Sequence, residues 1–253
     1  MKKFAIAVFC CSVFWLAGHG SAEEFLSGIE WAEPAVIDPG CCHKAPSDAI
    51  VLFDGTDMSA WNDADRWIVA DGVVTAAPGR PVTKEMFGDC QVHIEFASAE
   101  EIKGEGQGRS NSGVFLMGIY EIQILDSFEN KTYHDGQCGA IYKQHPPLVN
   151  ASRKPGAWQS YDIIWKCPKF DEEGKLVSPA FVTVLHNGVV IQNHFELQGD
   201  TPYNRAPEYK AHPAKGPIRL QYHGNPVQFR NIWVRELKEV ENKRVHEPKV
   251  VQH

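Results

Sequence analysis

The sequence lacks an apolar run long enough to cross a bilayer, which takes roughly 20 residues. Its first apolar run, from Phe4 to Ala17, follows Lys2 and Lys3 and is succeeded by small residues up to Ala22. A positive start, a short apolar stretch and small residues before a cleavage point are typical of a secretory signal peptide. We therefore expect residues 1–22 to be removed, and the mature protein to be periplasmic or extracellular without a transmembrane segment.

Basic charge is also scarce. The chain has 25 Lys and Arg residues against 32 Asp and Glu, a net charge of −7, and removal of Lys2 and Lys3 would bring it to −9. The remaining basic residues are scattered and form no stripe. Nucleic acid is therefore not an expected partner, because its recognition depends on a basic patch.

No Cys-x-x-Cys spacing occurs, so the sequence gives no support for a cysteine-based zinc site. Beyond residue 22 the cysteines are Cys41, Cys42, Cys90, Cys138 and Cys167, an odd number. In an oxidising compartment at most two disulfides can form, and one thiol is left over. Adjacent cysteines pair with each other only under backbone strain. The sequence does not fix the pairing.

A sustained helical period is missing, and short alternating strands take its place. Asp71-Gly72 and Asn187-Gly188 each separate two such runs, which predicts two tight hairpins. Many short strands with aromatic-rich alternation predict an all-β antiparallel sandwich or barrel. We expect strands at residues 50–53, 66–69, 73–76, 91–97, 113–117, 120–125, 139–142, 160–165, 181–185, 189–197, 218–222 and 228–236.

The expected organisation is one domain, because about 200 residues is an ordinary size for a single all-β unit. Residues 23–48, which are rich in proline and include two of the cysteines, are expected to form an N-terminal arm laid over the domain. The domain itself is expected over residues 49–237. Residues 238–253 are polar without a core-forming pattern, which predicts a flexible tail.

The segment from Tyr120 to Asp126 holds the most informative polar residues. Strand alternation places Glu121 and Gln123 on one face and the apolar residues on the other. A bulge at Leu125 would return Asp126 to the polar face. Such a row is either an outer face in solvent or the wall of a binding cleft, and the small residues 111–113 before it suit close approach of a ligand.

This row resembles the Glu-x-Asp-x-Glu pattern of jelly-roll glucanases at Glu121 only. The middle position is Gln123, and the last is Leu125 or Asp126. Retaining hydrolysis needs two carboxyl groups about 5 Å apart, and Asp126 is one methylene shorter than Glu. A conventional endo-β-glucanase is therefore the least favoured enzyme.

Further ordered motifs extend over the whole expected domain. Together they resemble the bacterial 3-keto-disaccharide hydrolase family from about residue 50 to residue 237. The resemblance implies a concanavalin A-like jelly roll of two antiparallel sheets, and cleavage of glycosides whose sugar carries a ketone at C3. The motifs are residues 52–55, 111–113, 138–147, 158–165, 184–189 and 219–234.

A ketone at C3 acidifies the C2 proton, so that one base can start an elimination and water can add afterwards. This route needs a base, a group that stabilises an enolate and a proton donor, but no matched carboxylates. The candidate catalytic residues are Glu121, His223 and Asp126. The candidate substrate-binding residues are Asn111, Gln123, Tyr142, Gln144, Arg219 and Gln221.

Aromatic and histidine side chains offer further candidates. Trp61 and Trp67 could stack on a sugar, as could Tyr142 and Tyr222. The sequence-based interpretation assigns Trp158, Trp165 and Trp233 to the core, gives His145 and His186 a weaker case for the site, and assigns His134, His194 and His212 to surface loops.

A second reading is a non-catalytic carbohydrate-binding module, because a fold does not fix a function. The sequence leaves open a divalent ion near Glu121, Asp126 and His223, although the spacing matches no metal motif. The expected partner is a carbohydrate, namely an oxidised di- or oligosaccharide for the enzyme. The sequence does not define the sugar, the linkage or the oligomeric state.

Overall fold

The computed structural model describes residues 23–41 and 44–252. The expected signal peptide and Cys42 lie outside them. The described part of the chain divides into two compact units, one of residues 36–238 and one that joins residues 23–35 to residues 239–252. The described part has two short 3-10 helices, η1 (Gly106–Gly108) and η2 (His134–Gly136), and no described helix could cross a membrane.

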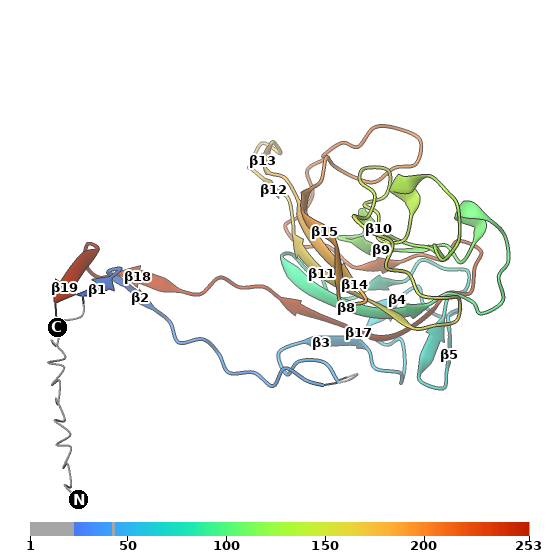
Figure 1. Cartoon of the computed structure of the whole chain (residues 1–253), viewed down its shortest axis with the longest axis horizontal. Coiled ribbons are helices and arrows are strands. Elements are labelled where there is room, and N and C mark those ends of the chain that lie inside the picture. The colour runs from blue at the N-terminus through green and yellow to red at the C-terminus, as the bar shows by residue number, and fades with distance from the viewer. Residues whose placement is uncertain (1–22, 42–43, 253) are drawn as a thin grey trace, which may run out of the picture. The chain divides into compact units, whose positions relative to one another are not determined.

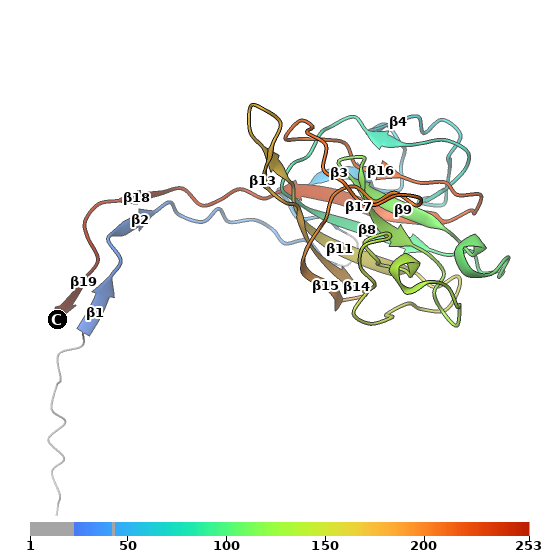
Figure 2. The same ribbon diagram turned by 90° about the horizontal axis from the view of Figure 1, so that it is seen from above.

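The larger of the two main sheets has eight antiparallel strands, and its long central members run side by side in Figure 2. Both predicted hairpins are confirmed: Asp71-Gly72 and Asn187-Gly188 all have positive φ, as this tight turn requires. In spatial order the strands are β15 (Val189–Glu196), β14 (Phe181–His186), β11 (Gln159–Lys166), β8 (Cys90–Ala97), β17 (Gln228–Glu236), β6 (Val73–Thr75) and β5 (Ile68–Ala70), with β3 (Ile50–Phe53) also paired to β17.

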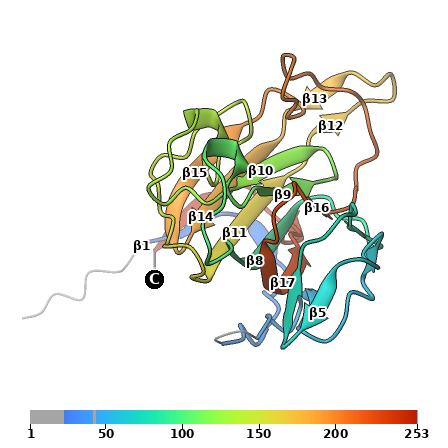
Figure 3. The same cartoon turned by 90° about the vertical axis from the view of Figure 1, so that its right-hand side faces the viewer.

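The smaller sheet has five antiparallel strands and lies over the larger one (Figures 1 and 3). The all-β, two-sheet jelly-roll sandwich expected from the sequence is therefore confirmed. The order of its strands is β10 (Tyr120–Ile124), β9 (Ser112–Leu116), β16 (Arg219–Leu220), β7 (Val82–Thr83) and β4 (Trp61–Asn62). A small hairpin of β12 (Lys169–Phe170) and β13 (Leu176–Ser178) stands beside the sandwich.

The core fills the space between the two sheets. In β11, Tyr161, Ile163 and Trp165 are fully buried and alternate with more exposed residues, as a strand with one face on a core requires. Trp165 and Trp233 are buried as expected, whereas Trp158 is only half-buried.

Trp61 and Trp67 were candidates for sugar stacking, and this prediction is wrong. Both are buried core residues. Trp61 donates its indole N–H to the Leu52 carbonyl at 2.8 Å, and Trp67 stacks on Phe229. Burial of an aromatic ring stabilises a fold strongly by itself, so an aromatic in a sequence motif need not contact a ligand.

The four described cysteines, Cys41, Cys90, Cys138 and Cys167, are all free thiols, and only Cys41 is exposed. Two of the three buried thiols have a polar partner instead. Cys138 lies 2.9 Å from the Tyr161 hydroxyl and Cys167 lies 3.0 Å from the Asp89 carboxylate. Within the described residues, cross-links do not contribute to the fold.

The terminal unit contains regular structure. β1 (Glu23–Leu26) pairs with β19 (Lys249–Gln252), and β2 (Ile29–Trp31) pairs with β18 (Asn242–Arg244), both antiparallel. The two segments that were expected to be an arm and a flexible tail thus form ladders with each other. The apolar side chains of Phe25 and Trp31 in this unit are exposed.

Candidate functional site

The strand β10 differs from the half-solvated strand that its alternation could indicate, because all five of its residues are buried. Tyr120, Ile122 and Ile124 belong to the hydrophobic core. Glu121 and Gln123 face the other way, yet only 5% of the Glu121 surface and 1% of the Gln123 surface are exposed. Their polar face therefore lies beneath other parts of the chain.

Two loops provide this cover. The segment 139–142, expected as a strand, forms only isolated bridges, and the Gly139 and Tyr142 N–H groups donate to the carbonyls of Gln123 and Glu121. At the same edge of the strand, the Thr201 hydroxyl accepts the Glu121 N–H at 3.0 Å. Loops thus complete the edge of β10 that β9 does not pair with, and leave a hollow above the polar row.

This hollow is a cavity of about 570 Å³. It contains seven of the nine predicted site residues, which come from β9, β10, β16 and the loops beside them. Six further residues line it that the sequence-based reasoning missed. The full lining is Arg80, Gln107, Asn111, Phe115, Glu121, Gln123, Tyr133, Tyr142, Thr201, Tyr203, Arg219, Gln221 and His223.

The carboxyl group of Glu121 lies over Gly113 on the neighbouring strand. A Cβ atom built at Gly113 would be 2.4 Å from Glu121 Oε1, so only glycine leaves room for the carboxyl group there. Burial raises the pKa of Glu121 to about 8, while the positive charge of Arg219 acts in the opposite direction. At neutral pH this carboxyl group is a weak acid whose conjugate base is unusually strong.

Arg219 reaches the cavity from β16 across the same sheet. Both Arg219 and Glu121 pair in register with Phe115, so the three residues form a row across three strands. The Arg219 guanidinium lies 3.4 Å from the centre of the Phe115 ring, a cation–π contact that holds it in place. A fixed positive charge thus stands near the buried carboxyl group.

Carboxamide groups line another part of the wall. Gln123 donates its amide N–H to Gln107 Oε1 at 2.9 Å, and Asn111 donates to the Gln107 carbonyl at 2.8 Å. The Oε1 atoms of Gln123 and Gln221 are buried without a hydrogen-bond partner in the described residues. Buried acceptors are costly to leave unpaired, so a ligand hydroxyl group that reached either atom would be bound favourably.

Two tyrosines contribute hydroxyl groups to the cavity. The phenolic oxygens of Tyr133 and Tyr142 are 2.7 Å apart, and the Lys143 ammonium lies 3.5 Å from the centre of the Tyr133 ring. Burial raises the pKa of both phenols above the usual range. Both therefore remain protonated at neutral pH and can donate hydrogen bonds.

Two predicted site residues do not line the cavity. Asp126 is buried and accepts hydrogen bonds from Arg109 Nε at 2.8 Å and the Phe128 N–H at 3.1 Å, so the bulge that would have returned it to the polar row does not apply. Gln144 donates to the carbonyls of Gly199 and Asp200. It fixes the loop that carries Thr201 and does not face the cavity.

The remaining candidates lie elsewhere. His223 is exposed and lines the cavity. His186 is a core residue bonded to Gln159, and burial lowers its pKa to about 4. His145 stacks on Phe195. Tyr222 is half-buried against the hydrophobic core.

The metal site considered from the sequence does not assemble in the described residues. Glu121 and His223 share the cavity, but the Asp126 carboxylate is held by Arg109. In the part of the chain that the structure describes, three His, Cys, Asp or Glu side chains nowhere come together in a group that could hold a metal ion.

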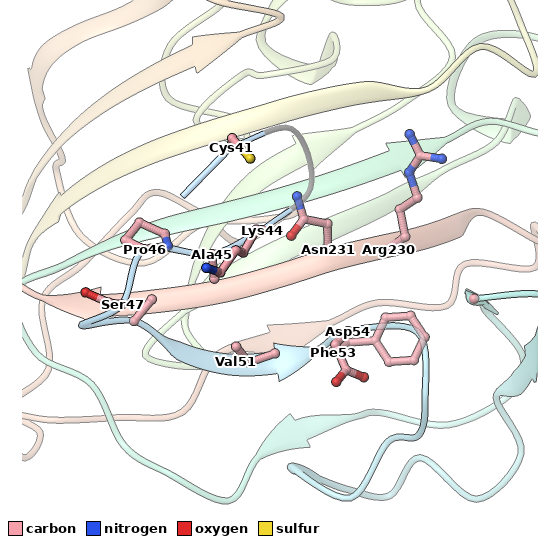
Figure 4. A pocket seen from close by; sticks show the side chains of 12 residues that line it. Cys41, Lys44, Ala45, Pro46, Ser47, Val51, Phe53, Asp54, Arg230 and Asn231 are labelled. Atoms are coloured by element: carbon pink, nitrogen blue, oxygen red, sulfur yellow. The ribbon is translucent and has the colours of Figure 1, made fainter. Parts of the chain in front are cut away.

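A second cavity, of about 760 Å³, is lined by Val51 and Phe53 of β3, by Arg230 and Asn231 of the neighbouring strand β17, and by residues 44–47 (Figure 4). Its polar groups are already used within the protein. Arg230 and Asn231 both bond to Glu95, and Lys44 pairs with Asp38. The cavity around Glu121, where the Oε1 atoms of Gln123 and Gln221 lack a partner in the described residues, is therefore the better candidate for a ligand site.

Comparison with known proteins agrees with this reading of the fold. Residues 48–235 match the family described as the 3-keto-alpha-glucoside-1,2-lyase-like domain. The crystal structure of a proposed glycosyl hydrolase from Parabacteroides distasonis is 49% identical, with a TM-score of 0.78 over 82% of this chain and 94% of that one. A second from the same organism is 24% identical, with a TM-score of 0.56 over 75% and 99%, and supports the fold alone. Among curated proteins no match is found.

Proposed function

This chain belongs to the 3-keto-alpha-glucoside-1,2-lyase-like domain family, and on that premise we propose that it cleaves glycosides whose sugar ring carries a ketone at C3. The proposed route removes the C2 proton, expels the oxygen at C1 and then adds water. Export of the protein, as expected from its first 22 residues, would let it meet such sugars outside the cytoplasm.

The observation that carries the proposal is the solitary carboxyl group of Glu121. It is the only Asp or Glu side chain among the described residues that line the cavity. Ordinary glycoside hydrolysis uses two carboxyl groups on either side of the scissile bond. An elimination needs only one base, and burial makes Glu121 a stronger base than an exposed carboxylate.

In the proposed first step, the Glu121 carboxylate removes the proton from C2. The electron pair of the C2–H bond forms a double bond between C2 and C3, and the negative charge moves to the C3 oxygen. The Arg219 guanidinium is held on Phe115 and can stabilise this enolate without reorganising. The carboxamides of Gln123 and Gln221 would hold the sugar hydroxyl groups.

In the second step the C3 carbonyl re-forms, a double bond forms between C1 and C2, and the bond from C1 to the leaving oxygen breaks. That oxygen takes a proton from an acid at the cavity, for which His223 and the Tyr133–Tyr142 pair are the candidates. Water then adds its hydroxyl to C1 and gives its remaining proton to the acid that protonated the leaving oxygen, and C2 regains a proton from Glu121. The sum is one glycoside and one water converted to a 3-keto sugar and an alcohol.

The pH dependence of the reaction follows from the pKa of Glu121. Only the deprotonated carboxylate can accept the C2 proton, so kcat/KM is expected to rise with pH and level off above a pH of about 8. Initial rates measured between pH 5 and pH 10 check this. A rate that falls through the same range would make Glu121 an acid instead of a base.

The test of the proposal is turnover of a 3-keto-disaccharide by the purified protein, compared with the same sugar carrying deuterium at C2. We expect release of the 3-keto monosaccharide, slower release from the deuterated substrate, and no cleavage of the unoxidised disaccharide. Binding without release would favour the carbohydrate-binding module. Equal single-turnover rates for the ordinary and the deuterated substrate would argue for direct hydrolysis at C1. Cleavage of an unoxidised β-glucan would favour the endo-β-glucanase interpretation.

A further inference from the structure

Two arginines in the cavity, Arg80 and Arg219, lack a carboxylate partner. The guanidinium of Arg219 contacts the Phe115 ring, and neither guanidinium forms a hydrogen bond or ion pair with the described residues. Four other arginines of the described chain do pair with Asp or Glu, namely Arg109, Arg205, Arg230 and Arg235.

The two guanidinium groups also affect each other. Arg219 lies on β16, which pairs with β7, and Arg80 precedes β7 by two residues. Burial lowers the pKa of Arg219, and the like charge of Arg80 lowers it further. Glu121 offers little compensation at neutral pH, because burial keeps it mostly protonated. An otherwise acidic protein thus has a cavity whose unpaired charges are positive.

A bound anion would remove this imbalance. Guanidinium groups form short, charge-assisted and often bidentate hydrogen bonds with carboxylate and sulfate-like oxygens. The developing enolate provides one negative oxygen, and only during the reaction. Two unpaired arginines in the resting protein therefore call for a negative group that the substrate already carries.

We propose that the substrate is an acidic 3-keto-glycoside, and that Arg80 and Arg219 together bind an oxyanion on it, either a carboxylate or a sulfate ester. This inference rests on the proposed function and narrows its substrate class. Gln123 and Gln221 line the same cavity, and their Oε1 atoms have no hydrogen-bond partner in the described residues. The cavity thus combines sites for hydroxyl groups with a site for one acidic group, as an acidic sugar requires.

The test uses unoxidised ligands, so that it needs no turnover. Calorimetry would compare methyl glucuronide, methyl glucoside 6-sulfate and methyl glucoside with the parent protein. We expect at least one of the two acidic ligands to bind at least about tenfold more tightly than the neutral one, a difference that weakens as salt is added. Tighter binding of methyl glucuronide would identify the oxyanion as a carboxylate, and tighter binding of methyl glucoside 6-sulfate would identify it as a sulfate ester.

Three variants make the test specific. Arg80→Met and Arg219→Met are expected to lose the preference for the acidic ligand. Arg66→Met removes the same charge from an exposed arginine outside this cavity and is expected to keep it. Arg80 is exposed as well, so its replacement is expected to leave the fold intact even if Arg219→Met fails to fold.

Equal binding of the acidic and neutral ligands would overturn this inference, as would a preference that survives in Arg80→Met. Neither result would touch the proposed function, which is tested by release of a 3-keto monosaccharide from a 3-keto-disaccharide and not by the binding of unoxidised ligands. Conversely, a preference for the acidic ligand in a protein that cleaves no 3-keto-glycoside would show that the arginine pair binds an anion and that the proposed function fails.

Discussion

Replacement of Glu121 by glutamine is expected to lower kcat/KM on a 3-keto-glycoside by about a thousandfold, the typical contribution of a general base. Glutamine has nearly the same shape and can still fill the space over Gly113. It cannot accept the C2 proton, and no other described carboxyl group lines the cavity to replace it. The measurement is the initial rate of sugar release at pH 9, where the parent carboxyl group is mostly ionised.

The matched control is Glu85→Gln, which makes the same change at an exposed residue outside the cavity. Its rate is expected to equal that of the parent. Circular dichroism and thermal unfolding of Glu121→Gln would show that the lower rate does not come from loss of fold. A folded Glu121→Gln protein with the parent rate would remove Glu121 from the mechanism and leave the base to another group, such as His223.

The local patterns that predicted the fold are those that depend on nearby residues. The Asp71-Gly72 and Asn187-Gly188 turns need only two residues with positive φ, and both hairpins form where expected. Strand alternation likewise placed Glu121 and Gln123 together on one face. It could not tell whether that face meets solvent or a cavity, because the cover comes from loops far away in the sequence.

The same limit explains the missed residues of the cavity. Arg80, Tyr133 and Thr201 lie in segments without a strand pattern, and only the fold brings them to Glu121. Phe115 could have been found, because it shares a face of β9 with Gly113, which the sequence had singled out. The segment 139–142 was expected to be a strand from its composition, but Gly139 has a positive φ and the chain turns there.

Asp126 shows how a partner that is distant in the sequence changes the role of a residue. A row of Glu, Gln and Asp suggested a shared catalytic face, yet Asp126 comes two residues after β10 ends. Its carboxylate forms an ion pair with Arg109, which precedes β9 in the chain. The pair therefore connects the segment before β9 with the segment after β10. The segment before β9 includes Gln107 and Asn111, which line the cavity, so Asp126 holds part of the cavity wall in place through Arg109.

Replacement of Asp126 by alanine is accordingly expected to lower the free energy of unfolding by about 3–5 kcal/mol, because it leaves a buried guanidinium without its partner. Only 2% of Asp126 and 8% of Arg109 are exposed, and the pair also bonds to the backbone of Phe128 at both its N–H and its carbonyl. Urea unfolding at pH 7 measures the loss.

The double variant Arg109→Met with Asp126→Leu separates this structural role from a catalytic one. Because it removes both charges and fills the space with apolar atoms, it is expected to regain much of the stability that Asp126→Ala loses. If Asp126 acts only through the fold, the recovered protein also regains cleavage of the 3-keto-glycoside. A stable double variant with no turnover would instead show that Asp126 takes part in catalysis, because the activity would then be lost while the fold is kept.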